Sequence, residues 1–168
     1  MRPLALALAA LTCFGANSLS NRRAPGFSLP DTHFSRYDLQ DYRGKWVLID
    51  FMLTNCPHCI KLAHNLETIK QKYGSRVAIL EVVLPPDTQA TVAKYIEDNH
   101  VTVPVLFDQG QMAASYFNAT PEKPGFDTPH LFVIDPKGHI ARDFSHEDED
   151  FIEGPQLFKE LEALTAKP

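Results

Sequence analysis

The order of apolar and polar residues along the chain predicts alternating strands and helices. Two nearly continuous apolar runs, 45–53 (KWVLIDFML) and 77–84 (VAILEVVL), are typical of central strands that are buried on both faces. Between these runs, apolar residues recur at helical spacing after Pro57, a residue type that the first turn of a helix tolerates well. Gly74 marks the expected end of this helix.

The second half of the chain continues the alternation. Residues 21–30 are expected to form an irregular lead-in, and residues 118–128 form a loop that contains proline and glycine. The remaining pattern predicts a helix over 88–99, a strand over 101–108, a short helix over 111–117, a hairpin of strands over 130–135 and 140–144, and a final helix over 155–166. Strands that alternate with helices and end in a hairpin predict an α/β sandwich with a mixed sheet.

The first 18 residues differ from the rest of the chain. Met1-Arg2 is followed by a run rich in Leu and Ala over 3–11, and small and polar residues then lead to Ser18. A basic start, a short apolar run and a small-residue exit are typical of a secretory signal peptide. We therefore expect a signal over 1–18 and one domain over 19–168. A buried N-terminal helix is one alternative, and a membrane tether through an uncleaved signal or a lipidated Cys13 is another.

Composition and charge limit the partners of this domain. The chain has 168 residues, which suffice for one domain with a substantial core, and its formal net charge is −5. An acidic protein without a basic run is not attracted to nucleic acid or to an anionic membrane surface. After the first residues, no apolar run is long enough for a transmembrane helix. The sequence therefore predicts no nucleic-acid partner, and we expect a monomer.

The cysteines carry the most specific chemical signal. Cleavage of the signal would leave one close pair in the motif Cys56-Pro57-His58-Cys59. At a helix start, the sulfur of Cys56 lies near unpaired N–H groups and the positive end of the helix dipole, which both favour the nucleophilic thiolate. Cys59, one turn deeper, is the expected resolving thiol. The spacing favours redox cycling over an inert structural disulfide or half of a metal site.

Three further residues could tune this pair. A protonated His58 would stabilise the Cys56 thiolate and make the disulfide more oxidising, unless it is only a solvated residue at the helix start. Asp50 interrupts an apolar strand, where burial would raise its pKa and let it take the Cys59 proton; the alternative is a strand-end aspartate bonded to the backbone. Glu81 interrupts the next strand, and we expect a solvated or packing role for it.

Together these segments resemble the thioredoxin superfamily, and within it the TlpA/ResA-like (redoxin) thiol-disulfide oxidoreductases. VLIDFMLTNCPHC resembles the strand, loop and redox helix of that group. APGFSLPD and LQDYRGKWVLIDF resemble its N-terminal extension, and TPHLFVIDPKGHI resembles its cis-proline segment and hairpin. The resemblance covers about residues 24–166 and implies a thioredoxin-like three-layer α/β/α sandwich with a central mixed sheet over 19–168.

The resemblance also implies roles for individual residues. Asp50 falls six residues before Cys56, where thioredoxins place a buried aspartate. Pro129 corresponds to the cis proline, and Thr128 and Pro57 join it as expected contacts of the substrate chain.

Three features depart from the family pattern: Asn55 replaces an aromatic residue, His64 replaces a helix proline, and the 118–128 loop is longer than in a minimal thioredoxin. These departures concern the substrate rather than the exchange chemistry.

The resemblance implies an extracytoplasmic enzyme, periplasmic or secreted, that requires no bound cofactor. It would exchange disulfides with the thiols of other secreted proteins and draw on a membrane electron-transfer protein as its redox partner. We expect a reductant of other secreted proteins, among them apocytochrome c during cytochrome c maturation, although strongly oxidising disulfide donors resemble the CPHC motif. No helical domain is inserted between 84 and 101, as those oxidants usually have.

Two alternative functions stay open. A copper-binding or metallochaperone-type module would use Cys56, Cys59 and a histidine such as His33 or His130, although related copper proteins space their cysteines by three residues rather than two. A thiol peroxidase would resemble a pattern with threonine three residues before the cysteine, whereas Thr54 stands two residues before Cys56.

Overall fold

The computed structural model describes residues 19–147 and 154–166. The expected signal peptide over 1–18, with Cys13, lies outside the described residues. Within the described ranges, no helix has the length and apolar character needed to cross a membrane.

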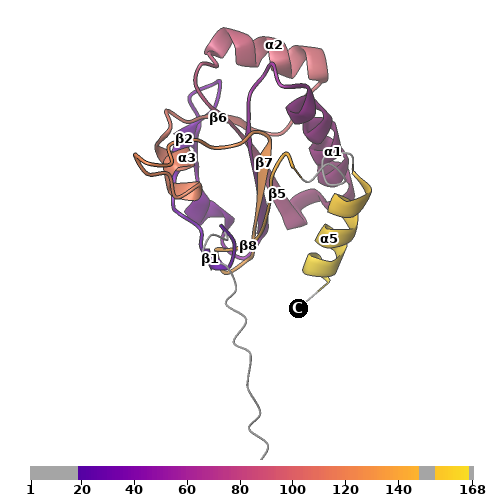
Figure 1. The fold of residues 1–168 in the computed structure, drawn as a ribbon. Coiled ribbons are helices and arrows are strands. Elements are labelled where there is room, and N and C mark those ends of the chain that lie inside the picture. The colour runs from indigo at the N-terminus through magenta and orange to yellow at the C-terminus, as the bar shows by residue number, and fades with distance from the viewer. Residues whose placement is uncertain (1–18, 148–153, 167–168) are drawn as a thin grey trace, which may run out of the picture.

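A six-stranded mixed sheet forms the centre of the molecule (Figure 1). Strands β4, β5 and β6 run parallel, whereas β7 is antiparallel to β4, β8 to β7, and β1 to β8. In sheet order the strands are β1 (Arg22–Arg23), β8 (His139–Phe144), β7 (His130–Ile134), β4 (Trp46–Met52), β5 (Val77–Val83) and β6 (Val105–Phe107). The mixed sheet predicted from the alternating pattern is confirmed.

Helices cover both faces of this sheet and complete three layers (Figure 1). One face packs against α1 (Pro57–Tyr73), α2 (Gln89–Asn99) and α5 (Pro155–Thr165). The other face packs against α3 (Gln111–Tyr116) and the N-terminal segment, which contains the hairpin of β2 (Ser28–Pro30) and β3 (Arg36–Asp38) and the short helix η1 (Leu39–Tyr42). A last short helix, η2 (Gly74–Arg76), joins α1 to β5. The thioredoxin-like three-layer sandwich is confirmed.

The two central strands separate two apolar cores. Every residue of β4 after Trp46 is buried, and β5 is buried along almost its whole length, as the continuous apolar runs predicted. Because side chains alternate along a strand, Leu48 and Met52 face α1, whereas Ile49 and Phe51 face α3. Asp50 has the parity of Leu48 and Met52 and therefore points into the apolar core beneath α1.

Local signals place both ends of α1. Cys56 is the N-cap residue, with extended backbone angles, and Pro57 follows in the first turn. At the other end, Gly74 has a positive φ of 55°, a conformation that glycine adopts with little strain. The long helix predicted from the apolar spacing is therefore confirmed from its start to its stop.

Two segments differ from the pattern-based expectation. The lead-in over 21–30 is not wholly irregular, because β1 pairs with β8 and β2 pairs with β3. Strands of two or three residues are too short to show an alternating pattern, and backbone pairing alone forms them. The strand expected over 101–108 begins only at Val105. Pro104 lacks an N–H group and accepts a bond through its carbonyl instead, so regular pairing starts after it.

Candidate functional site

The two cysteines lie where the chain passes from β4 into α1. Cys56 is half-buried and Cys59 is fully buried, and both are free thiols. The Cys56 sulfur caps the helix by accepting the backbone N–H of Cys59 at 3.3 Å. A sulfur in this position carries negative charge favourably because the helix dipole and an N–H donor both point at it.

The environment of Cys59, in contrast, disfavours a negative charge on its sulfur. Burial, the nearby Asp50 and a hydrogen bond to Cys56 raise the pKa of the Cys59 thiol far above its usual value. Cys59 therefore keeps its proton until a base removes it. The pair combines an accessible sulfur suited to attack with a protected one suited to a second step, in the order expected from the sequence.

Asp50 lies on the face of the sheet that packs against α1, the helix that contains Cys59. Its side chain is 0% exposed. Neither carboxyl oxygen of Asp50 has a hydrogen-bond partner within the described residues, so the alternative of an aspartate bonded to the backbone is wrong. Burial, then Glu81, then Cys56 raise the pKa of Asp50 well above its usual value. The raised pKa that the sequence predicted for this carboxyl is present, and it suits a group that exchanges protons with a thiol.

Of the solvated or packing role expected for Glu81, the structure excludes the solvated one. Glu81 is 0% exposed, and it pairs directly with Asp50 in the parallel register of β4 and β5. Burial raises its pKa to about 8, although the Tyr95 hydroxyl, which donates to it at 3.0 Å, acts in the opposite direction. The register of two strands is not visible in a single sequence, so the pairing of Glu81 with Asp50 could not be predicted.

The expected substrate contacts lie at the same end of the sheet. The Thr128–Pro129 bond is cis, as the resemblance implied, and β7 begins directly after it. His130 pairs with Phe51 near the end of β4, so Pro129 lies at the edge from which the chain continues to Cys56. Pro129 is buried and Thr128 is half-buried, whereas Pro57 and His58 are exposed at the start of α1. His58 therefore faces solvent beside the cysteine pair.

Comparison with known proteins agrees with this geometry. Residues 21–143 match the AhpC/TSA family. The chain belongs to the AhpC/TSA family. It is 27% identical over 143 residues to the thioredoxin-like protein YneN of Bacillus subtilis, a match that covers 84% of this chain and 75% of that protein. It is 23% identical over 146 residues to the thiol-disulfide oxidoreductase ResA of Bacillus thuringiensis, covering 87% of this chain and 76% of that protein.

A solved structure supports the fold of this AhpC/TSA protein. A secreted disulfide oxidoreductase of Mycobacterium tuberculosis, homologous to E. coli DsbE, superimposes with a TM-score of 0.59 at 16% identity, covering 71% of this chain and 82% of that chain. The resemblance to TlpA/ResA-like proteins is thus confirmed. The names of these relatives and the Cys56–Cys59 pair agree on thiol-disulfide oxidoreductase chemistry, the enzyme class expected from the sequence.

Sequence reasoning missed a carboxylate that holds the turn before Cys56 in this AhpC/TSA protein. Asp87 accepts the backbone N–H of Thr54 at 2.9 Å and also the Thr54 hydroxyl. It accepts the hydroxyl of Thr91, in the first turn of α2, at 2.8 Å. Asp87 thereby joins the turn that presents Cys56 to the start of α2. The contact spans 33 sequence positions, and no local pattern could reveal it.

Replacing Asp87 with alanine should lower the free energy of unfolding by about 2 kcal/mol, because the N–H and hydroxyl of Thr54 lose a charged acceptor. Urea denaturation of the reduced protein measures this change. Asp98→Ala is the matched control, since it removes an exposed α2 carboxylate that pairs with Lys94 across one helical turn. We expect that control to cost no more than about 0.5 kcal/mol. Equal losses in the two variants would contradict a structural role for Asp87.

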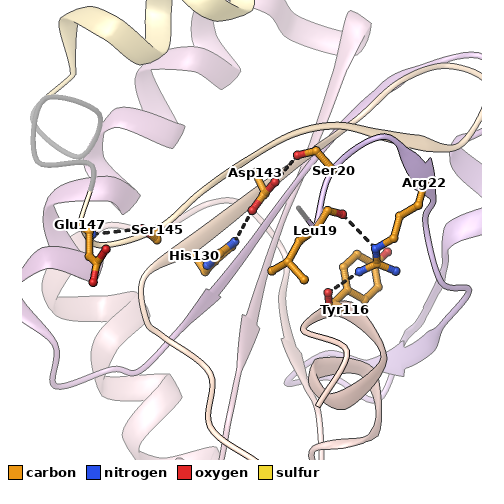
Figure 2. Close-up of polar contacts among 8 residues, drawn as sticks. All are labelled: Leu19, Ser20, Arg22, Tyr116, His130, Asp143, Ser145 and Glu147. Carbon is orange, nitrogen blue, oxygen red and sulfur yellow. Dashed lines mark hydrogen bonds and ion pairs between the residues drawn. The ribbon is translucent and has the colours of Figure 1, made fainter. Parts of the chain in front are cut away.

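The copper alternative named His33 or His130 as a third ligand beside the cysteines, and the structure does not place His130 there. His130 is buried on the opposite face of the sheet, where its ring stacks on Phe132 at 4.6 Å between centroids. Figure 2 shows its imidazole directed at the Asp143 carboxylate, 3.4 Å away, which also accepts the Ser20 hydroxyl. Across residues 19–147 and 154–166, no group of three or more His, Cys, Asp or Glu side chains is arranged to hold a metal.

Proposed function

We propose that this protein reduces disulfide bonds of other extracytoplasmic proteins through the Cys56–Cys59 dithiol. One observation carries the proposal: the accessible sulfur of Cys56 caps α1 directly above a buried thiol that burial and Asp50 keep protonated. An accessible nucleophile and a protected partner within one helical turn are the requirements for two successive exchange steps.

In the first step the Cys56 thiolate attacks one sulfur of the substrate disulfide. A mixed disulfide forms, the substrate S–S bond breaks, and the leaving thiolate takes a proton from solvent. In the second step the Asp50 carboxylate accepts the Cys59 proton, and the Cys59 thiolate attacks the Cys56 sulfur. The protein disulfide forms, and the substrate departs with both of its sulfurs reduced. Two electrons have passed from the pair to the substrate, without a bound cofactor.

The substrate would approach along the edge formed by the start of α1 and the cis-proline segment. An extended peptide can add to exposed backbone as a short strand, which gives affinity with little sequence preference. Thr128 is half-buried beside Pro129, Pro57 is exposed, and residues 121–125 of the neighbouring loop are all exposed. We therefore propose Thr128, Pro129 and Pro57 as substrate contacts, with the 118–128 loop as one wall of this surface.

We also propose an extracytoplasmic location for the protein and electron transfer from its dithiol to the substrate. The N-terminal signal pattern and the secreted relative from M. tuberculosis support an extracytoplasmic protein. The connection between β5 and β6 holds only a loop and α2, without the inserted helical domain of strong oxidants. A secreted reductant needs an external source of electrons, which we propose to be a membrane electron-transfer protein. Cysteines of apocytochrome c are the substrate we favour.

The reduction potential of the pair, measured against glutathione, tests the direction. A value near about −270 mV would support a reductant, and a value near about −120 mV would make the protein an oxidant. The same reduced protein, mixed with hydrogen peroxide, tests the peroxidase alternative. Stoichiometric peroxide consumption at a rate above that of free cysteine would favour that alternative over the proposed function.

Replacing His58 with alanine should lower the reduction potential by about 10–30 mV, which corresponds to about 1.4 kcal/mol or less for a two-electron couple. A protonated imidazole near the Cys56 thiolate stabilises the dithiol form, and the exposure of His58 keeps this effect small. His64→Ala removes an exposed histidine farther along α1 and is the matched control. Identical potentials for the His58 and His64 variants would mean that His58 is only a solvated helix residue.

A further inference from the structure

Asp50 and Glu81 form a pair of carboxyls that the exchange chemistry alone does not explain. They are direct partners on adjacent parallel strands, so both side chains leave the sheet on the face covered by α1 and α2. Both are 0% exposed, and no ion pair joins either of them to a basic side chain in the described part of the chain. An acid pair of this kind costs free energy, so its placement beneath a redox-active thiol calls for a cause.

The groups around the pair are acidic or neutral on every side. At the start of α1, the thiols of Cys56 and Cys59 interact electrostatically with Asp50. Farther along α1, the carboxylate of Glu67 raises the pKa of Glu81. From α2, the hydroxyl of Tyr95 donates to Glu81. The neighbouring residues in the sheet are apolar: Leu131 of β7 beside Asp50, and Val105 of β6 beside Glu81. No described cation therefore offsets a second negative charge at this place.

The two carboxyls are not equivalent. Among the described residues, Glu81 accepts one hydrogen bond that stabilises its anion, whereas both oxygens of Asp50 are without a partner. Glu81 is therefore the carboxyl that ionises first, and Asp50 can lose its proton only against the charge of its neighbour. An Asp50 carboxylate formed under these conditions is a much stronger base than an isolated aspartate.

We propose that Glu81 is a positioning residue for the resolving step, and that its charge tunes Asp50 into a base strong enough to deprotonate the buried Cys59 thiol. Proton transfer is efficient when the acceptor and the donor hold the proton with similar strength. Burial makes Cys59 a weak acid, and an ordinary carboxylate would be too weak a base for it. The inference rests on the proposed role of Cys59 as the resolving thiol.

The chromogenic disulfide dithiobis(nitrobenzoate) separates the two steps. Attack by Cys56 releases one coloured thiolate and leaves the other bound to Cys56. Attack by Cys59, after its proton passes to Asp50, releases the second thiolate and forms the protein disulfide. Stopped-flow absorbance from about pH 6 to about pH 10, a range around the ordinary cysteine pKa, gives the rate of each release. The second release carries the information about Asp50 and Glu81.

Removing the Glu81 charge should change the second release in two ways. In Glu81→Gln, whose amide can still accept from Tyr95, we expect the midpoint of its pH profile to fall by about one to two pH units. We also expect its alkaline plateau to fall, because Asp50 becomes a weaker base. Glu81→Met removes the same charge with an apolar side chain of similar size, and serves if the amide variant folds poorly. Glu81→Asp keeps the charge and should retain the wild-type profile.

The controls distinguish this inference from the proposed function. Glu97→Gln removes an exposed carboxylate from α2 and should leave both releases unchanged. If the first release is absent in the wild-type protein, the proposed function fails. If both releases occur and the midpoint in Glu81→Gln and Glu81→Met equals that of the wild type, the role of Glu81 is wrong while the proposed function stands. A loss of stability without a change of midpoint would assign Glu81 a purely structural part.

Discussion

Replacing Cys59 with serine is expected to leave a substrate protein covalently bound to Cys56. The buried Cys59 thiol is the group that resolves the mixed disulfide, and a serine hydroxyl cannot displace a disulfide sulfur at neutral pH. Incubation of reduced Cys59→Ser protein with a disulfide-bonded substrate should therefore produce a conjugate that is visible on a non-reducing gel. The conjugate should disappear when a reductant is added.

The matched variant is Cys56→Ser, which keeps the buried thiol and removes the accessible one. We expect it to form no conjugate and to slow disulfide exchange by more than about a thousandfold, because its remaining thiol is protonated and covered. Conjugates formed in equal amounts by the two variants would reverse the assignment of nucleophile and resolving thiol. Peptide mapping of the conjugate by mass spectrometry identifies the cysteine involved.

The reduced protein should lose stability as the pH rises from about 5 to about 8. Burial raises the pKa of Glu81 from 4.5 to about 8, so the carboxyl stays neutral in the folded state while the unfolded chain ionises. Unfolding then releases a proton, and each full proton lowers the free energy of unfolding by about 1.4 kcal/mol per pH unit. Asp50, whose pKa burial also raises, acts with the same sign. The total loss is on the order of several kcal/mol.

Urea denaturation of the reduced protein at several pH values measures this slope. Glu81→Gln and Asp50→Asn should each flatten it and should be more stable than the wild type near pH 8, whereas Glu97→Gln should keep the wild-type slope. Glu67 and Asp143, whose pKa values are lowered by their hydrogen bonds, act below the range of this experiment. Stability that is constant or increases between about pH 5 and about pH 8 would exclude two neutral buried acids beneath the cysteines.

The fold was predictable where one local pattern dominated. The apolar run of β4 and the helical spacing of α1, bounded by Pro57 and Gly74, each contain enough residues to define their element. The edge strand β1 has two residues, and its pairing with β8 depends on a segment more than a hundred positions away. Such strands follow from the completed sheet rather than from their own side chains.

The residues of the candidate site also fall into two groups: those that a local motif marks, and those whose positions depend on contacts between distant segments. Cys56, Cys59 and the cis Pro129 are marked by a motif and a resemblance, and the structure brings them to one end of the sheet. The positions of Glu81 and Asp87 depend on contacts between distant segments, across strands β4 and β5 and between the active-site turn and α2. A charged residue inside an apolar run shows that something unusual is buried, but only the register shows which group it meets.

The rate at which Cys56 reacts with iodoacetamide as a function of pH tests the central claim most directly. If the helix start holds Cys56 as a thiolate, the reduced protein should be alkylated at Cys56 at neutral pH several times faster than free cysteine, and Cys59 should react only after unfolding. A Cys56 that reacts no faster than free cysteine at neutral pH, or that is alkylated together with Cys59 in the folded protein, would contradict the account.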